Sequence, residues 1–251
     1  MTLYFEEFGP IEAPLLVFIH GGGVGGWMWE EQVKFFHDYH CLVPTLPEHG
    51  IQKGDIQFSI RESAKQLNDL IVEKANGQKI NVVGFSLGAQ IVVEMLSLQP
   101  TLIDKAMINS ALTRPIILPK HFVKSTVKLT YPLIRYKTFA KMQAKTLFIP
   151  SHLFNRYYEE SCVMTPDSLI RIMQENMNFK IPEAFSKVKS KMLVTVGEKE
   201  RGFMKKSAHD LAVCNENCHK IVWQDVGHGI SLKEPSLFNA TLLKWLRDDQ
   251  L

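Results

Sequence analysis

Short runs of apolar residues alternate along the chain with longer segments in which apolar residues recur at helical spacing. The runs are rich in β-branched residues and lack strict alternation, as expected for parallel strands buried on both faces. Six strands are predicted, over residues 15–19, 42–46, 80–85, 106–108, 192–196 and 221–226. Helices are predicted over residues 27–37, 60–74, 87–98, 204–213 and 235–246. This order predicts an α/β fold, a mostly parallel sheet of about six to seven strands flanked by helices.

The alternation breaks between about residues 112 and 182, a stretch that follows one predicted strand and precedes the next. It is too long for a simple crossover connection. Short helical patterns lie within it at 121–129 and 166–178, and prolines interrupt it repeatedly. We therefore predict a helical cap over residues 112–185, inserted into an α/β core made of residues 1–111 and 186–251.

Composition and charge place the chain among ordinary globular proteins. Its 251 residues suit one large α/β domain or two small ones, and 45% apolar with 22% charged residues argue against a disordered or fibrous chain. Lys and Arg number 29 and Asp and Glu 26, which gives a net charge of +3. So small a bias predicts no nucleic-acid partner for the chain as a whole.

Neither a targeting segment nor a membrane anchor is predicted. The first residues lack the basic start and apolar core of a signal peptide. No run approaches the roughly 18 apolar residues of a transmembrane helix. The cysteines are too few for a secreted disulfide scaffold, so we expect a cytoplasmic, reduced protein. Cys214 and Cys218 lack a second ligand pair at zinc-site spacing, and no metal or other cofactor is expected.

The most informative motif is Gly84-Phe85-Ser86-Leu87-Gly88, which joins the strand at 80–85 to the helix at 87–98. A sharp strand-to-helix turn holds its central residue in a strained conformation and requires small neighbours. The hydroxyl of Ser86 would project from the carboxyl end of the strand, beside the free N–H groups of a helix N-terminus. A chance pentapeptide in a tight crossover is the alternative. The context favours a catalytic nucleophile at Ser86.

A second strand, at 15–19, runs into His20-Gly21-Gly22-Gly23. Glycines let backbone N–H groups approach a substrate and stabilise negative charge on a carbonyl oxygen. We predict that the N–H groups of Gly22 and Leu87 form such an oxyanion hole, with Gly23 as the near alternative. A phosphate loop would need either the Lys-Ser/Thr pair of a P-loop or a full Gly-x-Gly-x-x-Gly with a following acid, and neither is found here. A turn without chemistry remains the other interpretation.

A serine hydroxyl needs a base, and that base needs an orienting acid. His228 follows the last predicted strand, so its loop can reach over Ser86, whereas His20 is better placed to brace the glycine loop. The expected chain order is Ser, acid, His. Glu200 lies furthest into the loop after the strand at 192–196 and is the predicted acid. Glu198 and Asp225 are alternatives.

Together these residues resemble the α/β-hydrolase superfamily, in particular its capped esterase and lipase-like members. The resemblance covers nearly the whole chain and is weakest in the cap. The motifs that carry it occur in the family's order: His20-Gly21-Gly22-Gly23, Trp27-Met28-Trp29, Leu46-Pro47-Glu48-His49-Gly50, Gly84-Phe85-Ser86-Leu87-Gly88 and Gly227-His228.

The chain departs from the family pattern at three places. The family usually has Asp where this chain has Glu200, and the extra methylene shifts the carboxylate. A Pro-Gly-His-Gly turn common in relatives has Glu48 in place of its first glycine. Asn109-Ser110 stands where some relatives place their acid, which closes that alternative.

The predicted activity is that of a carboxylesterase that cleaves small esters with an apolar acyl part through an acyl-enzyme. A thioesterase, amidase or carbon–carbon bond hydrolase with the same Ser86, Glu200 and His228 is the alternative, as is a ligand-binding protein of low turnover. A dehalogenase is disfavoured because that chemistry needs a carboxylate nucleophile at position 86.

The predicted cap contains a basic segment. Between Thr113 and Pro150 there are eight Lys or Arg and no Asp or Glu. Lys120, Lys124 and Lys128 are spaced four apart and share one face of a helix. We interpret this face as a solvated outer surface. The alternative is a surface that attracts anionic lipid or an acidic substrate.

Overall fold

The computed structural model describes residues 3–50, 56–116 and 119–247, which form one sheet of seven strands. The order across the sheet is β1-β3-β2-β4-β5-β6-β7. All neighbouring strands are parallel except β1 and β3. The strands are β1 Phe5–Phe8, β2 Leu15–Ile19, β3 His40–Pro44, β4 Ile80–Phe85, β5 Lys105–Asn109, β6 Lys191–Gly197 and β7 Cys218–Trp223. The predicted fold class is confirmed.

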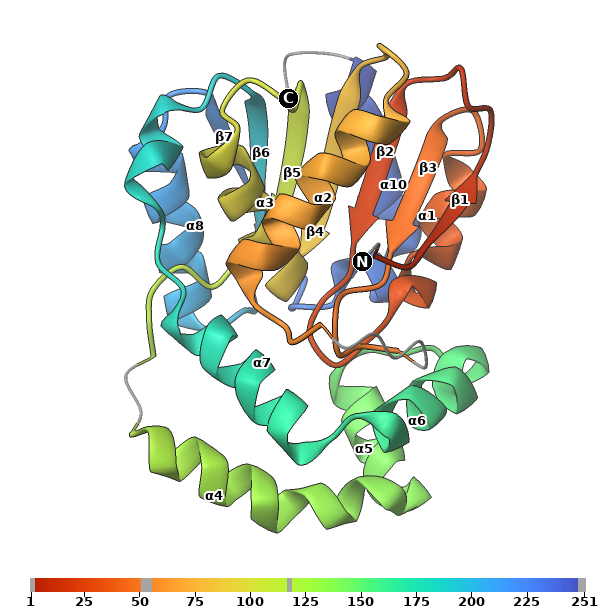
Figure 1. Cartoon of the computed structure of the whole chain (residues 1–251), viewed down its shortest axis with the longest axis vertical. Coiled ribbons are helices and arrows are strands. Elements are labelled where there is room, and N and C mark those ends of the chain that lie inside the picture. Colours follow the sequence, from red (N-terminus) through yellow and green to blue (C-terminus); the bar gives the residue numbers. More distant parts are fainter. Residues whose placement is uncertain (1–2, 51–55, 117–118, 248–251) are drawn as a thin grey trace.

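Helices cover both faces of the sheet (Figure 1). On one face lie α2 Ile60–Lys74, α3 Leu87–Leu98 and α8 Gly202–Cys214. On the other lie the 3-10 helix η1 Gly26–Trp29, α1 Glu30–Phe35 and α10 Pro235–Arg247. The short helix α9 Ile230–Lys233 precedes α10.

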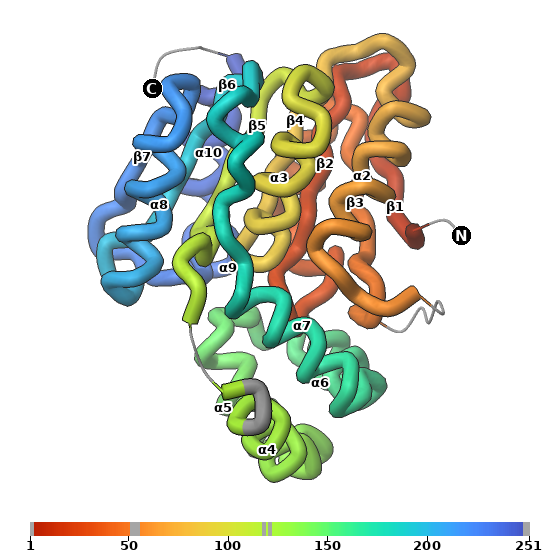
Figure 2. The backbone as a smooth tube through the Cα atoms, turned by 60° about the vertical axis from the view of Figure 1, so that its left-hand side comes forward, coloured from red at the N-terminus to blue at the C-terminus, as the bar shows by residue number. Residues whose placement is uncertain are grey.

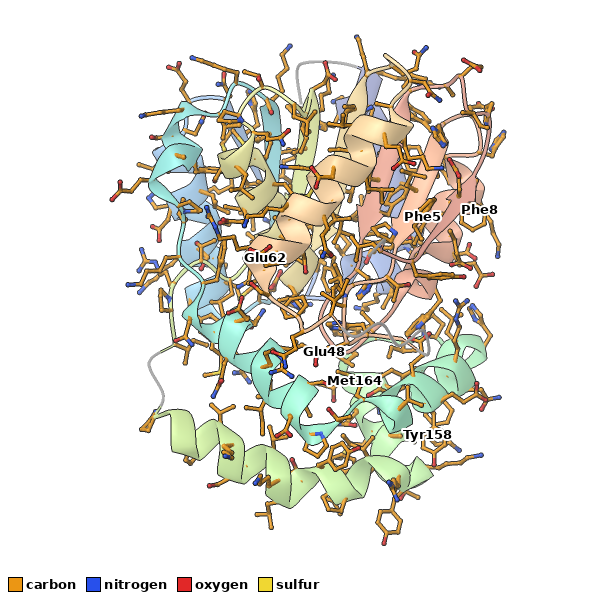
Figure 3. The ribbon with its side chains drawn as sticks, viewed as in Figure 1. Phe5, Phe8, Glu48, Glu62, Tyr158 and Met164 are labelled. Carbon is orange, nitrogen blue, oxygen red and sulfur yellow. The ribbon has the colours of Figure 1, made fainter. Side chains whose placement is uncertain are left out.

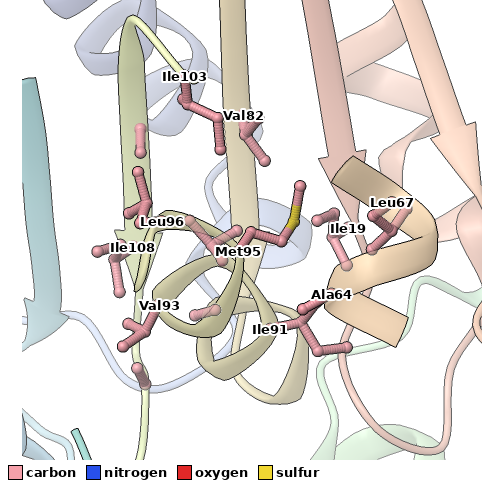
Figure 4. Packing of buried hydrophobic residues seen from close by; sticks show 14 of the residues in the cluster. Ile19, Ala64, Leu67, Val82, Ile91, Val93, Met95, Leu96, Ile103 and Ile108 are labelled. Atoms are coloured by element: carbon pink, nitrogen blue, oxygen red, sulfur yellow. The ribbon is translucent and has the colours of Figure 1, made fainter. Parts of the chain in front are cut away.

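Strand β2 shows why these runs lack alternation. Its five residues are all buried. Leu15, Val17 and Ile19 belong to the core between the sheet and α2, α3 and α8, whereas Leu16 and Phe18 belong to the core under α10. Figure 4 shows the first of these cores, with Ile19 and Val82 from the sheet packed beside residues of α2 and α3. Successive side chains of a strand point to opposite faces, so both must be apolar.

The predicted strands at 15–19 and 80–85 are confirmed to the residue. The strands predicted at 42–46 and 221–226 lie two and three residues too late, because the observed strands begin at the polar residues His40 and Cys218-His219. Strand β1 was not predicted. It contains two glutamates and is a half-exposed edge strand, so it carries no apolar run. The helix predicted at 27–37 is η1 followed by α1.

Between β5 and β6 the chain forms four α-helices beside the carboxyl ends of the strands (Figures 1 and 2). We call them the cap helices: α4 Lys120–Thr130, α5 Lys137–Thr146, α6 Phe154–Val163 and α7 Pro166–Asn178. The 3-10 helices η2 Tyr131–Arg135, η3 Ser151–Leu153 and η4 Glu183–Lys187 lie in the same segment. The limits of the cap at residues 112 and 185 stay a prediction. No helix in the described part of the chain has the length and apolar character needed to cross a bilayer.

Candidate active site

Ser86 occupies the turn between β4 and α3. Its backbone has φ 54° and ψ −110°, a conformation that residues other than glycine rarely adopt. A Cβ atom on Gly84 would lie 2.5 Å from the carbonyl oxygen of Gly88, and one on Gly88 would collide with the carbonyl oxygen of Ile19. The two glycines are therefore required by packing, as the sequence motif indicates.

The structure brings Ser86, His228 and Glu200 together in one chain of hydrogen bonds. His228 lies in the loop between β7 and α9. Its Nδ1 lies 2.7 Å from Glu200 Oε2, and its Nε2 lies 3.1 Å from Ser86 Oγ. With the proton on Nδ1, the imidazole donates to the carboxylate and accepts from the serine hydroxyl. This is the arrangement in which a histidine can take the serine proton.

The Glu200 carboxylate is almost completely buried, with 7% of the residue exposed. Its Oε1 accepts hydrogen bonds from the backbone N–H of Gly197 at 2.9 Å and from Ser110 Oγ at 2.7 Å. Burial alone raises the pKa of this carboxyl, but the donors from His228, Gly197 and Ser110 outweigh it, and the pKa lies below its ordinary value. Glu200 is therefore ionised at neutral pH.

The two alternative acids lie elsewhere. Glu198 Oε2 accepts the backbone N–H of Asp225 at 3.0 Å. Asp225 is exposed and forms an ion pair with Lys199 at 2.9 Å. Among the described residues no hydrogen bond joins either carboxylate to His228, so the geometry favours Glu200.

Gly22 and Leu87 lie side by side next to Ser86. A Cβ on Gly22 would lie 3.4 Å from Leu87 Cδ2. Leu87 is the first residue of α3, so its N–H has no partner within the helix. Gly23 has φ 73°, and nothing lies within 4 Å of the position of a Cβ there. The role of Gly22 and Leu87 in holding an oxyanion stays a prediction.

The His20 side chain stabilises the glycine loop through two hydrogen bonds. Its Nδ1 donates to the carbonyl oxygen of Gly21 at 2.8 Å, and its Nε2 accepts the backbone N–H of Leu46 at 3.0 Å. Both ring nitrogens are therefore occupied in the neutral form. Burial, with a smaller effect of His49, lowers the pKa of His20 to about 3.

A cavity of about 510 Å³ opens onto Ser86 and His228. Five large apolar side chains line it: Leu112, Ile116, Phe148, Phe203 and Met204. The ring of Phe148 packs against Gly229, where a Cβ would lie 2.6 Å from Phe148 Cδ2. A larger cavity of about 620 Å³, beside Lys79 and Lys189, lies at the amino ends of the strands, and no residue of the Ser86 site lines it.

Cys214 and Cys218 have free thiols. Burial raises the pKa of the Cys218 thiol to about 12, and its Sγ lies 3.9 Å from Met192 Sδ. Within residues 3–50, 56–116 and 119–247 no group of three His, Cys, Asp or Glu could hold a metal ion.

Ser110 is the residue of this site that the sequence did not reveal. It is buried, has φ 57° and reaches Glu200 from the end of β5. Its place after a strand is the signal that could have marked it, because the carboxyl ends of neighbouring parallel strands meet at one edge of the sheet.

Comparisons with known proteins agree with the fold. A family model described as the alpha/beta hydrolase fold matches residues 14–132. An AB hydrolase superfamily protein of Gibberella zeae is 29% identical over 110 residues, 43% of this chain and 39% of that protein. A pimeloyl-[acyl-carrier protein] methyl ester esterase of Nitrosospira multiformis is 26% identical over 113 residues, 44% of this chain and 42% of the relative. The match thus spans about two fifths of each of these relatives.

The structural likeness extends over the whole chain. An esterase from Exiguobacterium antarcticum superposes with a TM-score of 0.81 at 17% identity, over 98% of this chain and 96% of that one. The structure of MenH from S. aureus gives a TM-score of 0.76 at 18% identity and covers 100% of both chains.

Proposed function

This chain has the α/β-hydrolase fold, and we propose that it is a serine hydrolase that cleaves carboxylic esters with Ser86, His228 and Glu200. One observation carries the proposal. The Ser86 hydroxyl, the His228 imidazole and the buried Glu200 carboxylate form a continuous hydrogen-bonded chain at 3.1 and 2.7 Å. The names of several relatives, a methyl ester esterase and two methylesterases among them, support ester chemistry.

In the first step His228 Nε2 takes the proton of Ser86 as Oγ attacks the ester carbonyl. The Nδ1–H of His228 keeps its hydrogen bond to Glu200, whose ionised carboxylate stabilises the imidazolium. His228 then gives its proton to the departing alcohol, and the acyl group remains on Ser86. In the second step water gives a proton to His228 as it attacks the acyl-enzyme. His228 returns that proton to Ser86 Oγ as the bond between Oγ and the acyl carbon breaks and the acid leaves.

The negative charge of each tetrahedral intermediate would be held by the N–H groups of Gly22 and Leu87. Their closeness beside Ser86 supports this assignment. Backbone donors fixed before the reaction stabilise such charge by about 3–4 kcal/mol per donor in mutational studies of other hydrolases.

The cavity beside Ser86 supports an apolar substrate group. Its apolar lining offers favourable burial to an acyl or alkyl chain, and its volume of about 510 Å³ suits a small molecule. The exposed residues Lys199 and Arg201 also line the cavity.

Hydrolysis of p-nitrophenyl acetate, butyrate and octanoate by the wild-type protein and by Ser86→Ala tests the proposal. We expect turnover that depends on chain length, a loss of about 10⁴-fold or more in Ser86→Ala, and labelling of the wild type alone by a fluorophosphonate probe. Ser97→Ala is the matched control, because Ser97 is a buried serine of α3 that bonds only to the backbone oxygen of Val93. Labelling that persists in Ser86→Ala would contradict the assignment. Acyl thioesters and anilides in the same assay separate ester hydrolysis from thioesterase and amidase activity.

A further inference from the structure

The first two cap helices, α4 and α5, lie in a strongly basic segment without acidic residues. From Thr113 to Pro150 the chain has eight Lys or Arg and no Asp or Glu. Arg114 pairs with Asp210 of α8. Among the described residues, no ion pair joins Lys124, Lys128 or Lys145 to a carboxylate. The charge of this segment is therefore largely uncompensated.

Large apolar side chains are exposed on the same helices. Of 14 exposed large hydrophobic residues in the described part of the chain, six lie within residues 122–148. Leu129 is 80% exposed and Tyr136 63%. Phe122, Leu133 and Met142 are exposed as well. Single exposed apolar residues are ordinary, but such a concentration in one short segment marks an interaction surface.

The internal packing of α4 does not account for these residues. Val123 and Val127 of α4 pack against Ile170 of α7 and are buried. At helical spacing, Phe122 and Leu129 lie along one side of the exposed surface of α4, and Lys124 and Lys128 lie along its other side. Figures 1 and 2 show α4 as the outermost element, with α7 between it and the core. The side chains of Phe122 and Leu129 are exposed by 55% and 80%.

We propose that this outer cap face, formed by Phe122, Lys124, Lys128, Leu129, Leu133 and Tyr136, docks onto the surface of an anionic lipid bilayer. Lysines are attracted to anionic headgroups while leucine, phenylalanine and tyrosine enter the interface, and a basic amphipathic surface provides both. An acidic protein would satisfy the lysines but gives no reason for isolated, fully protruding side chains such as Leu129. The apolar members therefore decide between the two partners.

Docking through this face would place against the bilayer a segment, residues 122–148, that also reaches the cavity. Phe148 belongs to the same segment, ends the stretch of exposed apolar residues and lines the cavity beside His228. This consequence rests on the proposed function, in that a bilayer would then supply a lipid-soluble ester. Binding itself needs none of the residues of the Ser86 site.

Cosedimentation with sucrose-loaded vesicles tests the proposal. Vesicles of phosphatidylcholine alone are compared with vesicles that also contain phosphatidylglycerol. We expect binding to the anionic vesicles, weakening with added salt. Since each basic residue near such a surface contributes about 1 kcal/mol, the double charge reversal Lys124→Glu/Lys128→Glu should lower the partition coefficient by about tenfold or more. Leu129→Ser should lower it by a smaller factor at every salt concentration.

The matched control is Lys206→Glu/Val213→Glu, which changes an exposed lysine and an exposed valine on α8. It should bind like the wild type, and circular dichroism should show that all variants are folded. Ser86→Ala should also bind like the wild type, so a failure of the proposed esterase activity does not affect the test. Equal binding to both kinds of vesicle, an equal loss in the α8 control, or full binding by Leu129→Ser would each overturn the proposal.

Discussion

Ser110 Oγ donates a 2.7 Å hydrogen bond to one oxygen of Glu200, while the other oxygen accepts Nδ1–H of His228. Ser110 is itself held by Asn109, whose Nδ2 donates to Ser110 Oγ at 3.2 Å and to Thr195 Oγ1 at 3.0 Å. The backbone of Ser110 is left-handed, with φ 57°, a conformation that costs about 1–3 kcal/mol in a non-glycine residue. The end of β5 thus orients the acid that orients His228.

Replacing Ser110 by alanine should therefore slow the reaction with little effect on substrate binding. Hydrogen bonds to charged groups contribute about 1.5–3 kcal/mol, and part of that here fixes the carboxylate. We expect kcat for p-nitrophenyl butyrate to fall about tenfold while KM changes less than about twofold. Ser97→Ala, a buried serine away from the site, should leave both constants unchanged. An unaltered kcat in Ser110→Ala would show that Gly197 and His228 suffice to hold Glu200.

The side-chain length of Glu200 should affect the rate, because its two carboxylate oxygens accept hydrogen bonds from different elements. Oε1 accepts from Gly197 and Ser110, and Oε2 accepts from His228. A carboxylate shorter by one methylene cannot keep both Ser110 and His228 at hydrogen-bond distance without a backbone shift. We expect Glu200→Asp to lower kcat/KM about tenfold, and Glu200→Gln, which removes the charge opposite the imidazolium, by about 10³–10⁴-fold. Steady-state kinetics of the two variants measure the difference. Aspartate at wild-type activity would mean that the loop after β6 adapts freely.

Ser86 and His228 could be predicted as site residues because both lie in loops that follow apolar runs. Ser86 follows β4, and His228 stands five residues after β7. An apolar run identifies a strand, and the residue after a parallel strand lies at the carboxyl-end edge of the sheet. The glycines at 84 and 88 restrict the conformation of the turn between them. The sequence motif and local sterics therefore agree at Ser86. The parallel sheet brings the loops that carry Glu200 and His228 to the same edge.

What could not be predicted depends on tertiary contacts. Strand β1 is held by pairing with β3, and its glutamates give no apolar signal. The helices α5 and α6 were not predicted; each has only ten residues, so the helical period is short in both. Ser110 is a small polar residue whose role depends on Glu200, 90 residues further along the chain. No pattern within the sequence joins those two positions.

Glu48 illustrates a departure from the family pattern that the structure explains. It has φ 62°, a backbone conformation in which glycine is usual. Its carboxylate accepts two hydrogen bonds from Arg171 of α7, at 2.8 and 2.9 Å, and another from the Phe58 N–H. Figure 3 shows Glu48 beside α7, where the core meets the cap helices. The Glu48 side chain thus ties α7 to the core.

Glu48→Gly should accordingly destabilise the protein less than Glu48→Ala, by about 1 kcal/mol, because glycine relieves the backbone strain while both variants lose the ion pair. A double-mutant cycle with Arg171→Met, followed by urea unfolding, should give a coupling free energy of about 1–2 kcal/mol for this bidentate, partly buried pair. A coupling near zero would mean that α7 is held to the core by packing alone.

His20 and His49 give the protein a defined response to acid. Their rings lie 5.1 Å apart, and burial is the main cause that lowers their pKa values, to about 3 for His20 and about 4 for His49. Both are neutral in the folded protein near pH 5, whereas in the unfolded chain a histidine has its ordinary pKa of about 6.5. The unfolded chain then binds more protons, so the free energy of unfolding must fall as pH drops below about 6.5.

Between pH 7 and pH 5 each of these histidines should remove about 2 kcal/mol from the free energy of unfolding. His20→Gln should be less stable than the wild type at pH 7, since its bonds to Gly21 and Leu46 are lost, yet it should lose about 2 kcal/mol less over this pH range. The test is therefore the change in the free energy of unfolding with pH, not its absolute value. Urea unfolding at pH 7 and pH 5 measures this slope. Equal slopes for wild type and His20→Gln would contradict the neutral, doubly bonded imidazole, because a histidine that binds its proton equally in both states makes no contribution to the pH dependence.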